Sequence, residues 1–140
     1  NVALPNVPKR KTGELRIHYI DVGQGDAALI EFPDEKVMLI DGGDGSKSAT
    51  KSLLRYMNAL EIDKIDDLVL THADNDHSGG LLDVIKHKTI FNAYLPASFC
   101  KNVHLSDRIL TSAVSTRQLT KMPNVQKRLQ YFSATTCVIL

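Results

Sequence analysis

The most constraining feature of this sequence is the segment 71–80, which reads Thr-His-Ala-Asp-Asn-Asp-His-Ser-Gly-Gly and directly follows an apolar run. Four side chains that can bind a metal fall within six residues: His72, Asp74, Asp76 and His77. Buried charged groups must be paired or coordinated, so a loop of this kind folds inward at low cost only around a cation. The segment therefore predicts a divalent metal site. The alternative interpretation is a solvated acidic loop that leads into a capped helix.

The spacing of these side chains favours two neighbouring metal positions. His72 and Asp74 are two residues apart, so both can point to the same side of an extended loop. Asp76 and His77 lie at the entry of the next helix and can reach an adjacent position. Ser78 is predicted to cap that helix through its hydroxyl group. One loop can thus supply ligands to two metals.

The hydrophobic pattern changes its period along the chain. Apolar runs of β type come first and predict a β-meander with strands at 15–21, 26–32 and 36–41. From Ser46 the period becomes helical for about four turns. Strands and helices then alternate, with strands at 65–71 and 90–95, helices at 81–87 and from Ser106, and a β-like tail at 130–140. This order predicts an α/β layered fold with a mixed sheet.

Length and composition are those of one soluble globular domain, with 140 residues of which 43% are hydrophobic. We expect a polar N-terminal tail at 1–14 and one domain at 15–140. No apolar run approaches the roughly 20 residues of a membrane helix, and the polar N-terminus has no apolar signal core. The net charge of +1 provides no global attraction to nucleic acid or to membranes. A polyanionic substrate would therefore have to be recognised by a local site.

Two cysteines, Cys100 and Cys137, lie in apolar contexts. They predict buried thiols in a reducing compartment, so we expect a cytoplasmic protein. Cys137 also begins the C-terminal Cys-Val-Ile-Leu, which fits a prenylation pattern. The same four residues fit the end of a β-strand equally well in composition, and no second anchoring signal lies beside them. We therefore favour the strand.

Three motifs occur in a characteristic order. The His-x-Asp-x-Asp-His pattern at 72–77 resembles the metal motif of the metallo-β-lactamase superfamily. Segments 21–27 (Asp-Val-Gly-Gln-Gly-Asp-Ala) and 39–43 (Leu-Ile-Asp-Gly-Gly) are similar to the matching stretches in the hydrolase domain of ComEC-type DNA-uptake competence proteins. The resemblance covers residues 15 to about 96. It implies a metallo-β-lactamase-like layered sandwich, of which this chain holds the N-terminal half.

The resemblance also implies a role for each ligand. His72 and Asp74 would hold the first metal, and Asp76 and His77 the second. Asp76 would in addition be catalytic, because its charge would lie beside the attacking hydroxide. Asp41 would support the ligand loop as a hydrogen-bond acceptor behind a ligating imidazole. The cofactors would be two divalent ions, zinc or manganese, and the hard oxygen of Asp74 shifts preference away from strict zinc.

Other candidate residues are less well defined by the sequence. Asp21 and Asp26 flank a loop that would border the cleft, although turn residues with capping carboxylates are an equal alternative. The family completes its site with ligands in the second half of the fold, for which His104 and Asp107 are the downstream candidates. Their context is not that of a strand end, so the sequence predicts an incomplete ligand set.

The two remaining histidines, His18 and His87, are predicted to lie on the surface. His18 alternates away from the apolar positions of its strand, whereas His87 ends a helix beside two lysines. Neither is expected to bind metal.

Two functions remain open from the sequence. The first is a metal-dependent hydrolase, in which the cations lower the pKa of a bridging water and the hydroxide attacks an ester or a phosphodiester, of a small molecule or of nucleic acid. The second is a catalytically incomplete or truncated α/β module that binds metal weakly or serves as a protein-interaction domain. A lone half of the fold would expose an apolar sheet face, so we expect self-association through that face or through the 131–140 edge.

Overall fold

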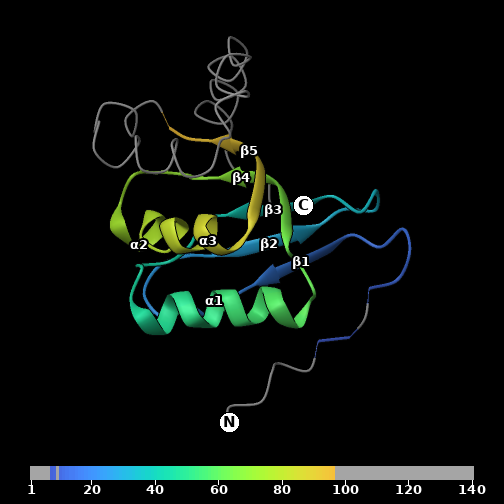
Figure 1. Ribbon diagram of the computed structural model, residues 1–140, viewed down its shortest axis with the longest axis horizontal. Helices are drawn as coiled ribbons and strands as arrows, with labels where there is room; N and C mark the ends of the chain where they lie inside the picture. Colours follow the sequence, from blue (N-terminus) through green and yellow to red (C-terminus); the bar gives the residue numbers. More distant parts are fainter. Residues whose placement is uncertain (1–6, 9, 97–140) are drawn as a thin grey trace.

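A mixed five-stranded sheet organises the chain (Figure 1). The computed structural model describes residues 7–8 and 10–96. The strands follow one another across the sheet in sequence order: β1 (Arg16–Tyr19), β2 (Ala28–Glu31), β3 (Val37–Ile40), β4 (Lys64–Val69) and β5 (Thr89–Tyr94). The first three strands pair antiparallel, and β3, β4 and β5 pair parallel. The predicted meander, the mixed sheet and the α/β class are therefore confirmed.

Helices connect the parallel strands. Ser46 is the N-cap of α1 (Lys47–Ala59), and its hydroxyl oxygen accepts a hydrogen bond from the Ala49 N–H at 3.2 Å. Two shorter helices, α2 (Asn75–Ser78) and α3 (Leu81–His87), link β4 to β5. Within the described ranges, no helix combines the length and the apolar character that a membrane crossing requires.

The predicted cap at Ser78 is wrong. Gly80 is the N-cap of α3, and the Ser78 hydroxyl donates to the carbonyl of Ala73 at 3.4 Å. The reason is that an additional helical turn, α2, occupies part of the polar loop, and Ser78 is its last residue. A turn of four residues is too short to show a helical period in the sequence.

The helices α1 and α3 cover one face of the sheet and contact each other (Figure 1). The centre of this core consists of fully buried side chains from the sheet and both helices: Leu29, Leu39, Leu53, Met57, Leu68, Leu81 and Val84. Each such side chain stabilises the fold by about 1.5–3 kcal/mol relative to an exposed one. The core therefore holds the carboxyl ends of β3 and β4, where the polar loops begin, in fixed positions.

The opposite face of the sheet is apolar across β1, β2 and β3 and only partly covered. In-register neighbours across β1, β2 and β3 share this face, so Tyr19, Ala28 and Ile40 form one row. Tyr19 is 76% exposed at the edge, whereas Ala28 and Ile40 are half-buried. Self-association through this face stays a prediction, and the 131–140 edge lies outside the described residues.

The prediction that His18 lies on the surface is wrong. His18 is 8% exposed, because the face of β1 that carries it lies under α1. Its Nε2 is 2.7 Å from Oε2 of Glu31, and its Nδ1 is 3.0 Å from the Tyr56 hydroxyl of α1. The Nε of Arg16 lies 3.2 Å from the same Glu31 oxygen. The Glu31 carboxylate thus pairs with both Arg16 and His18 in a buried polar cluster.

Replacing Glu31 by alanine should destabilise the protein strongly. The change leaves Arg16 and His18 without their shared acceptor in a buried environment, which costs about 3 kcal/mol or more of the free energy of unfolding. Chemical denaturation measures this loss. The control is Lys36→Ala, which breaks an exposed pair with Asp34 and should cost less than about 1 kcal/mol. Equal effects of the two variants would contradict the prediction.

Candidate metal centre

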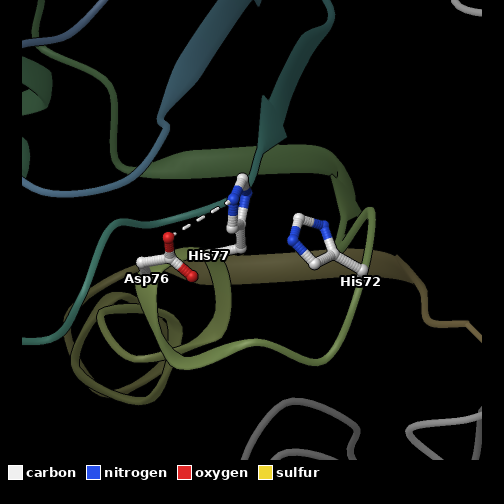
Figure 2. Close-up of side chains that lie close together, drawn as sticks. All are labelled: His72, Asp76 and His77. Atoms are coloured by element: carbon white, nitrogen blue, oxygen red, sulfur yellow. Dashed lines mark ion pairs between the residues drawn. The ribbon is translucent and has the colours of Figure 1, made fainter.

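The structure brings together three of the four ligands predicted in the 71–80 loop. One ligand atom each of His72, Asp76 and His77 lies within 4.8 Å of the others. Figure 2 shows the His72 ring turned toward that of His77 and the Asp76 carboxylate approaching from the other side. The centroids of the two imidazole rings are 3.8 Å apart. Asp74 lies at the margin of the group: its side chain is 77% exposed, with Oδ2 3.8 Å from Nε2 of His72.

Asp41, at the end of β3, links its own loop to the ligand loop. Its carboxylate accepts hydrogen bonds from the backbone N–H of Thr71 at 2.8 Å and from the Thr71 hydroxyl at 2.6 Å. The same carboxylate lies 2.9 Å from Nδ1 of His77. Because a carboxylate only accepts, Nδ1 carries a proton, and in the neutral imidazole Nε2 therefore has a free lone pair. This arrangement presents Nε2 of His77 to a metal in the orientation typical of ligating histidines.

The charges around His77 alter its affinity for a proton. Burial lowers the pKa of His77, but the hydrogen bond and charge of Asp41 and the charges of Asp76 and Asp26 outweigh burial and raise it above its usual value. In the metal-free protein His77 therefore keeps its second proton to higher pH. A metal must displace that proton, so metal affinity declines as pH falls through this raised pKa.

Three segments that lie far apart in the sequence meet at this site. The Gly42 N–H donates to the carbonyl of His77 at 2.8 Å, and the Gly43 N–H donates to the carbonyl of Asp26 at 2.9 Å. The Asp26 N–H in turn donates to the carbonyl of Asp76 at 3.3 Å. The β1–β2 loop, the β3–α1 loop and the ligand loop thus form one backbone-bonded assembly.

The two carboxylates of the β1–β2 loop differ in what they contact. Asp21 accepts a hydrogen bond from the Gly23 N–H at 3.0 Å, which is the turn-capping arrangement. Asp26 instead places Oδ2 3.9 Å from Nε2 of His77. Of the two, only Asp26 is directed at the ligand group in the described part of the chain.

Gly25 permits the close approach between the β1–β2 loop and the ligand loop. Its φ is +99°, and a Cβ at this position would lie 1.7 Å from the carbonyl oxygen of Asp76. Replacing Gly25 by alanine should cost about 2–5 kcal/mol, because backbone strain and overpacking add, and it should also weaken metal binding. Thermal unfolding and a metal titration measure the two effects.

The matched control for this prediction is Gly23→Ala in the same loop. Gly23 also has a positive φ, +74°, but a Cβ there meets nothing within 4 Å. Its replacement should therefore cost only the backbone strain, about 1–2 kcal/mol, and should leave metal binding intact. If both variants bound metal like the unmodified chain, the close approach would not matter for the site.

The other histidines and cysteines add no ligands in the described part of the chain. His87 is exposed, as predicted, and its Nδ1 donates a hydrogen bond to the carbonyl of Asp83 at 2.7 Å. His104, Asp107, Cys100 and Cys137 lie outside the described residues.

The donor set fits a divalent transition metal. Imidazole nitrogens and carboxylate oxygens together are ligands that suit zinc or manganese. The side chain of His77 is only 12% exposed yet has carboxylates on several sides, an arrangement that a cation would neutralise.

Comparisons with known proteins show the family of this chain. Residues 20–95 match the family model of the metallo-beta-lactamase superfamily. The chain is 30% identical over 103 residues to ComE operon protein 3 of Bacillus subtilis (strain 168), covering 63% of this chain and 13% of that protein. It is 34% identical over 73 residues to Recombination protein 2 of Haemophilus influenzae, covering 51% of this chain and 9% of that protein. The chain thus spans about a tenth of the length of these relatives, which are of the ComEC type.

One solved structure aligns with part of this chain. It is described as a new diphosphatase from the PhnP family and is 22% identical to this chain, with a TM-score of 0.47. The superposition covers 66% of this chain and 36% of the diphosphatase.

Proposed function

Because the chain belongs to the metallo-β-lactamase superfamily, we propose that it carries the first set of ligands of a divalent-metal hydrolase site that cleaves a phosphodiester. The observation that supports this most directly is His77, whose Nδ1 is held by Asp41 and whose Nε2 faces the carboxylates of Asp76 and Asp26. An imidazole oriented in this way is the usual form of a metal-ligating histidine.

The residues of the ligand loop would divide the work between two metals. His72 with Asp74 would hold one ion, and His77 with Asp76 the other. A bound divalent cation supplies two effects: it lowers the pKa of water and offsets negative charge on the scissile group. The negative charge of Asp76 would lie beside the attacking hydroxide. Asp41 would keep His77 in the tautomer that can bind a metal through Nε2.

We propose nucleic acid as the substrate class. The support is that the two relatives are of the ComEC type and that one of them is named Recombination protein 2. The net charge of +1 adds nothing to this choice, so binding of a polyanion would depend on the metals themselves. A small phosphodiester or ester is the competing substrate class, which a parallel assay with a chromogenic phosphodiester would identify.

Metal dependence tests the proposed function directly. In a protein that combines this ligand set with the second set, hydrolysis of a phosphodiester should require added divalent metal and should stop when a chelator is present in excess. Manganese should support activity at least as well as zinc, because the oxygen of Asp74 is a hard ligand. Assays of single-stranded DNA and of a chromogenic phosphodiester across both metals measure this. Activity that persists in chelator would contradict a metal-dependent reaction.

A second candidate function has a specific observation in its favour. Between residues 10 and 96, one group of three side chains already lies close enough together to hold a metal, and all three come from the ligand loop. A chain with this ligand set alone would bind metal weakly and act as a binding or interaction module. The two functions are distinguished by turnover: the module would bind metal without hydrolysing any of the substrates above.

A further inference from the structure

We propose that Asp26, in the loop between β1 and β2, is a direct ligand of the metal held by His77 and Asp76. This inference rests on the proposed function and adds to it a ligand from outside the 71–80 loop. It assigns a role to a carboxylate that the sequence alone leaves undecided between a turn residue and a site residue.

The distances around His77 support this assignment. The Oδ2 atoms of Asp26 and of Asp76 each lie 3.9 Å from Nε2 of His77. In a coordination sphere with metal–ligand bonds of about 2.1 Å, neighbouring ligand atoms are about 3.0–3.4 Å apart. Each carboxylate oxygen therefore needs to come less than about 1 Å closer to Nε2 to share a metal with it. The Asp26 side chain must also turn toward Asp76, because it lies outside the close group of His72, Asp76 and His77. The Asp26 side chain is 80% exposed, so a rotamer change can provide this movement.

The backbone of Asp26 is fixed on the ligand loop while its side chain remains available. Its N–H donates to the carbonyl of Asp76, and its carbonyl accepts from Gly43. The absence of a Cβ at Gly25 allows this contact. Among the described residues, the Asp26 carboxylate forms an ion pair with His77, whereas the carboxylate of Asp21 in the same loop caps a turn.

Asp26 would complete a set of ligands that suits catalysis. With Asp26, the metal at His77 has three protein ligands, one imidazole nitrogen and two carboxylate oxygens. Three protein ligands and an open position are the arrangement found in catalytic rather than structural sites. Two carboxylates also offset the charge of a divalent cation, and their oxygens favour manganese over strict zinc.

A calorimetric titration of the purified 140-residue chain with manganese tests this assignment. Asp26→Asn should weaken manganese binding at the His77 position by at least about tenfold. Even the loss of a residue that only supports a metal ligand lowers metal affinity by about 10–100-fold. The matched control is Asp21→Asn, which removes the same charge from the same loop and should bind like the unmodified chain. Cobalt substitution provides a second readout, since the visible spectrum of bound cobalt should change in Asp26→Asn and stay the same in Asp21→Asn.

Further variants separate the possible failures. Asp26→Ala should reproduce the loss, and Asp26→Glu should restore part of the affinity because it keeps the charge and the oxygens. If Asp26→Asn and Asp26→Ala bind as tightly as the unmodified chain while His77→Ala loses binding, Asp26 is not a ligand and the proposed function stands. If the unmodified chain binds no metal, both the assignment and the proposed function are wrong. Circular dichroism confirms that each variant is folded.

Discussion

His77→Ala is expected to abolish metal binding by this chain, with a loss in affinity of at least about 100-fold. The loss of a supporting residue already lowers metal affinity by up to about 100-fold, and His77 is the proposed direct ligand at the centre of the group. Its Nε2 faces the carboxylates of Asp26 and Asp76, so no neighbouring nitrogen can take its place except that of the more exposed His72. Calorimetric titration with manganese or zinc measures the loss.

His87→Ala is the control for this prediction. His87 is exposed at the end of α3, and its ring pairs with the carbonyl of Asp83 in its own helix. Its removal should leave metal affinity unchanged. Undiminished metal binding in His77→Ala would mean that the metal binds elsewhere in the chain.

Asp76→Asn is expected to reduce phosphodiester cleavage by about 10²- to 10³-fold, because a cation contributes several kcal/mol of transition-state stabilisation that depends on its placement. Asp76 belongs to the close ligand group and its side chain is partly buried, whereas the Asp74 side chain is far more exposed. Asp74→Asn should therefore be the milder change, and it should shift the metal preference toward zinc. Steady-state rates measured across metals compare the two variants.

A greater loss in Asp74→Asn than in Asp76→Asn would reverse the assignment of the two carboxylates. The comparison is well matched, because both residues lie in one loop and both changes remove one negative charge. Asp41→Asn should act differently, by loosening Thr71 and His77 together, and should therefore lower stability as well as metal affinity.

Most elements of the fold could be predicted because hydrophobic period is a local property. The alternation in the first strands and the helical spacing after Ser46 are visible within short windows, and the structure places the elements within about two residues of these runs. The helix α2 could not be predicted, since four residues in a polar loop have no period to detect. The prediction of Ser78 as a helix cap is wrong for the same reason, because Ser78 lies inside this short helix.

The environment of His18 shows a second limit of sequence reasoning. Alternation along β1 separates His18 from Ile17 and Tyr19, but it does not say which of the two faces a helix will cover. The structure buries the histidine face under α1 and leaves Tyr19 exposed. The polar cluster of His18, Glu31 and Tyr56 makes that burial possible, and its members come from three different elements.

By itself, the sequence determined the types and order of the elements and the chemistry of the ligand loop, because residue type and short spacing act locally. Only the tertiary structure decided which groups meet at His77. Asp41 lies 36 positions before His77, and Asp26 comes from a different hairpin. Their approach depends on strand register, on a core that fixes the ends of β3 and β4, and on backbone contacts at Gly25, Gly42 and Gly43. Such contacts arise from packing over long sequence separations, which no local pattern encodes.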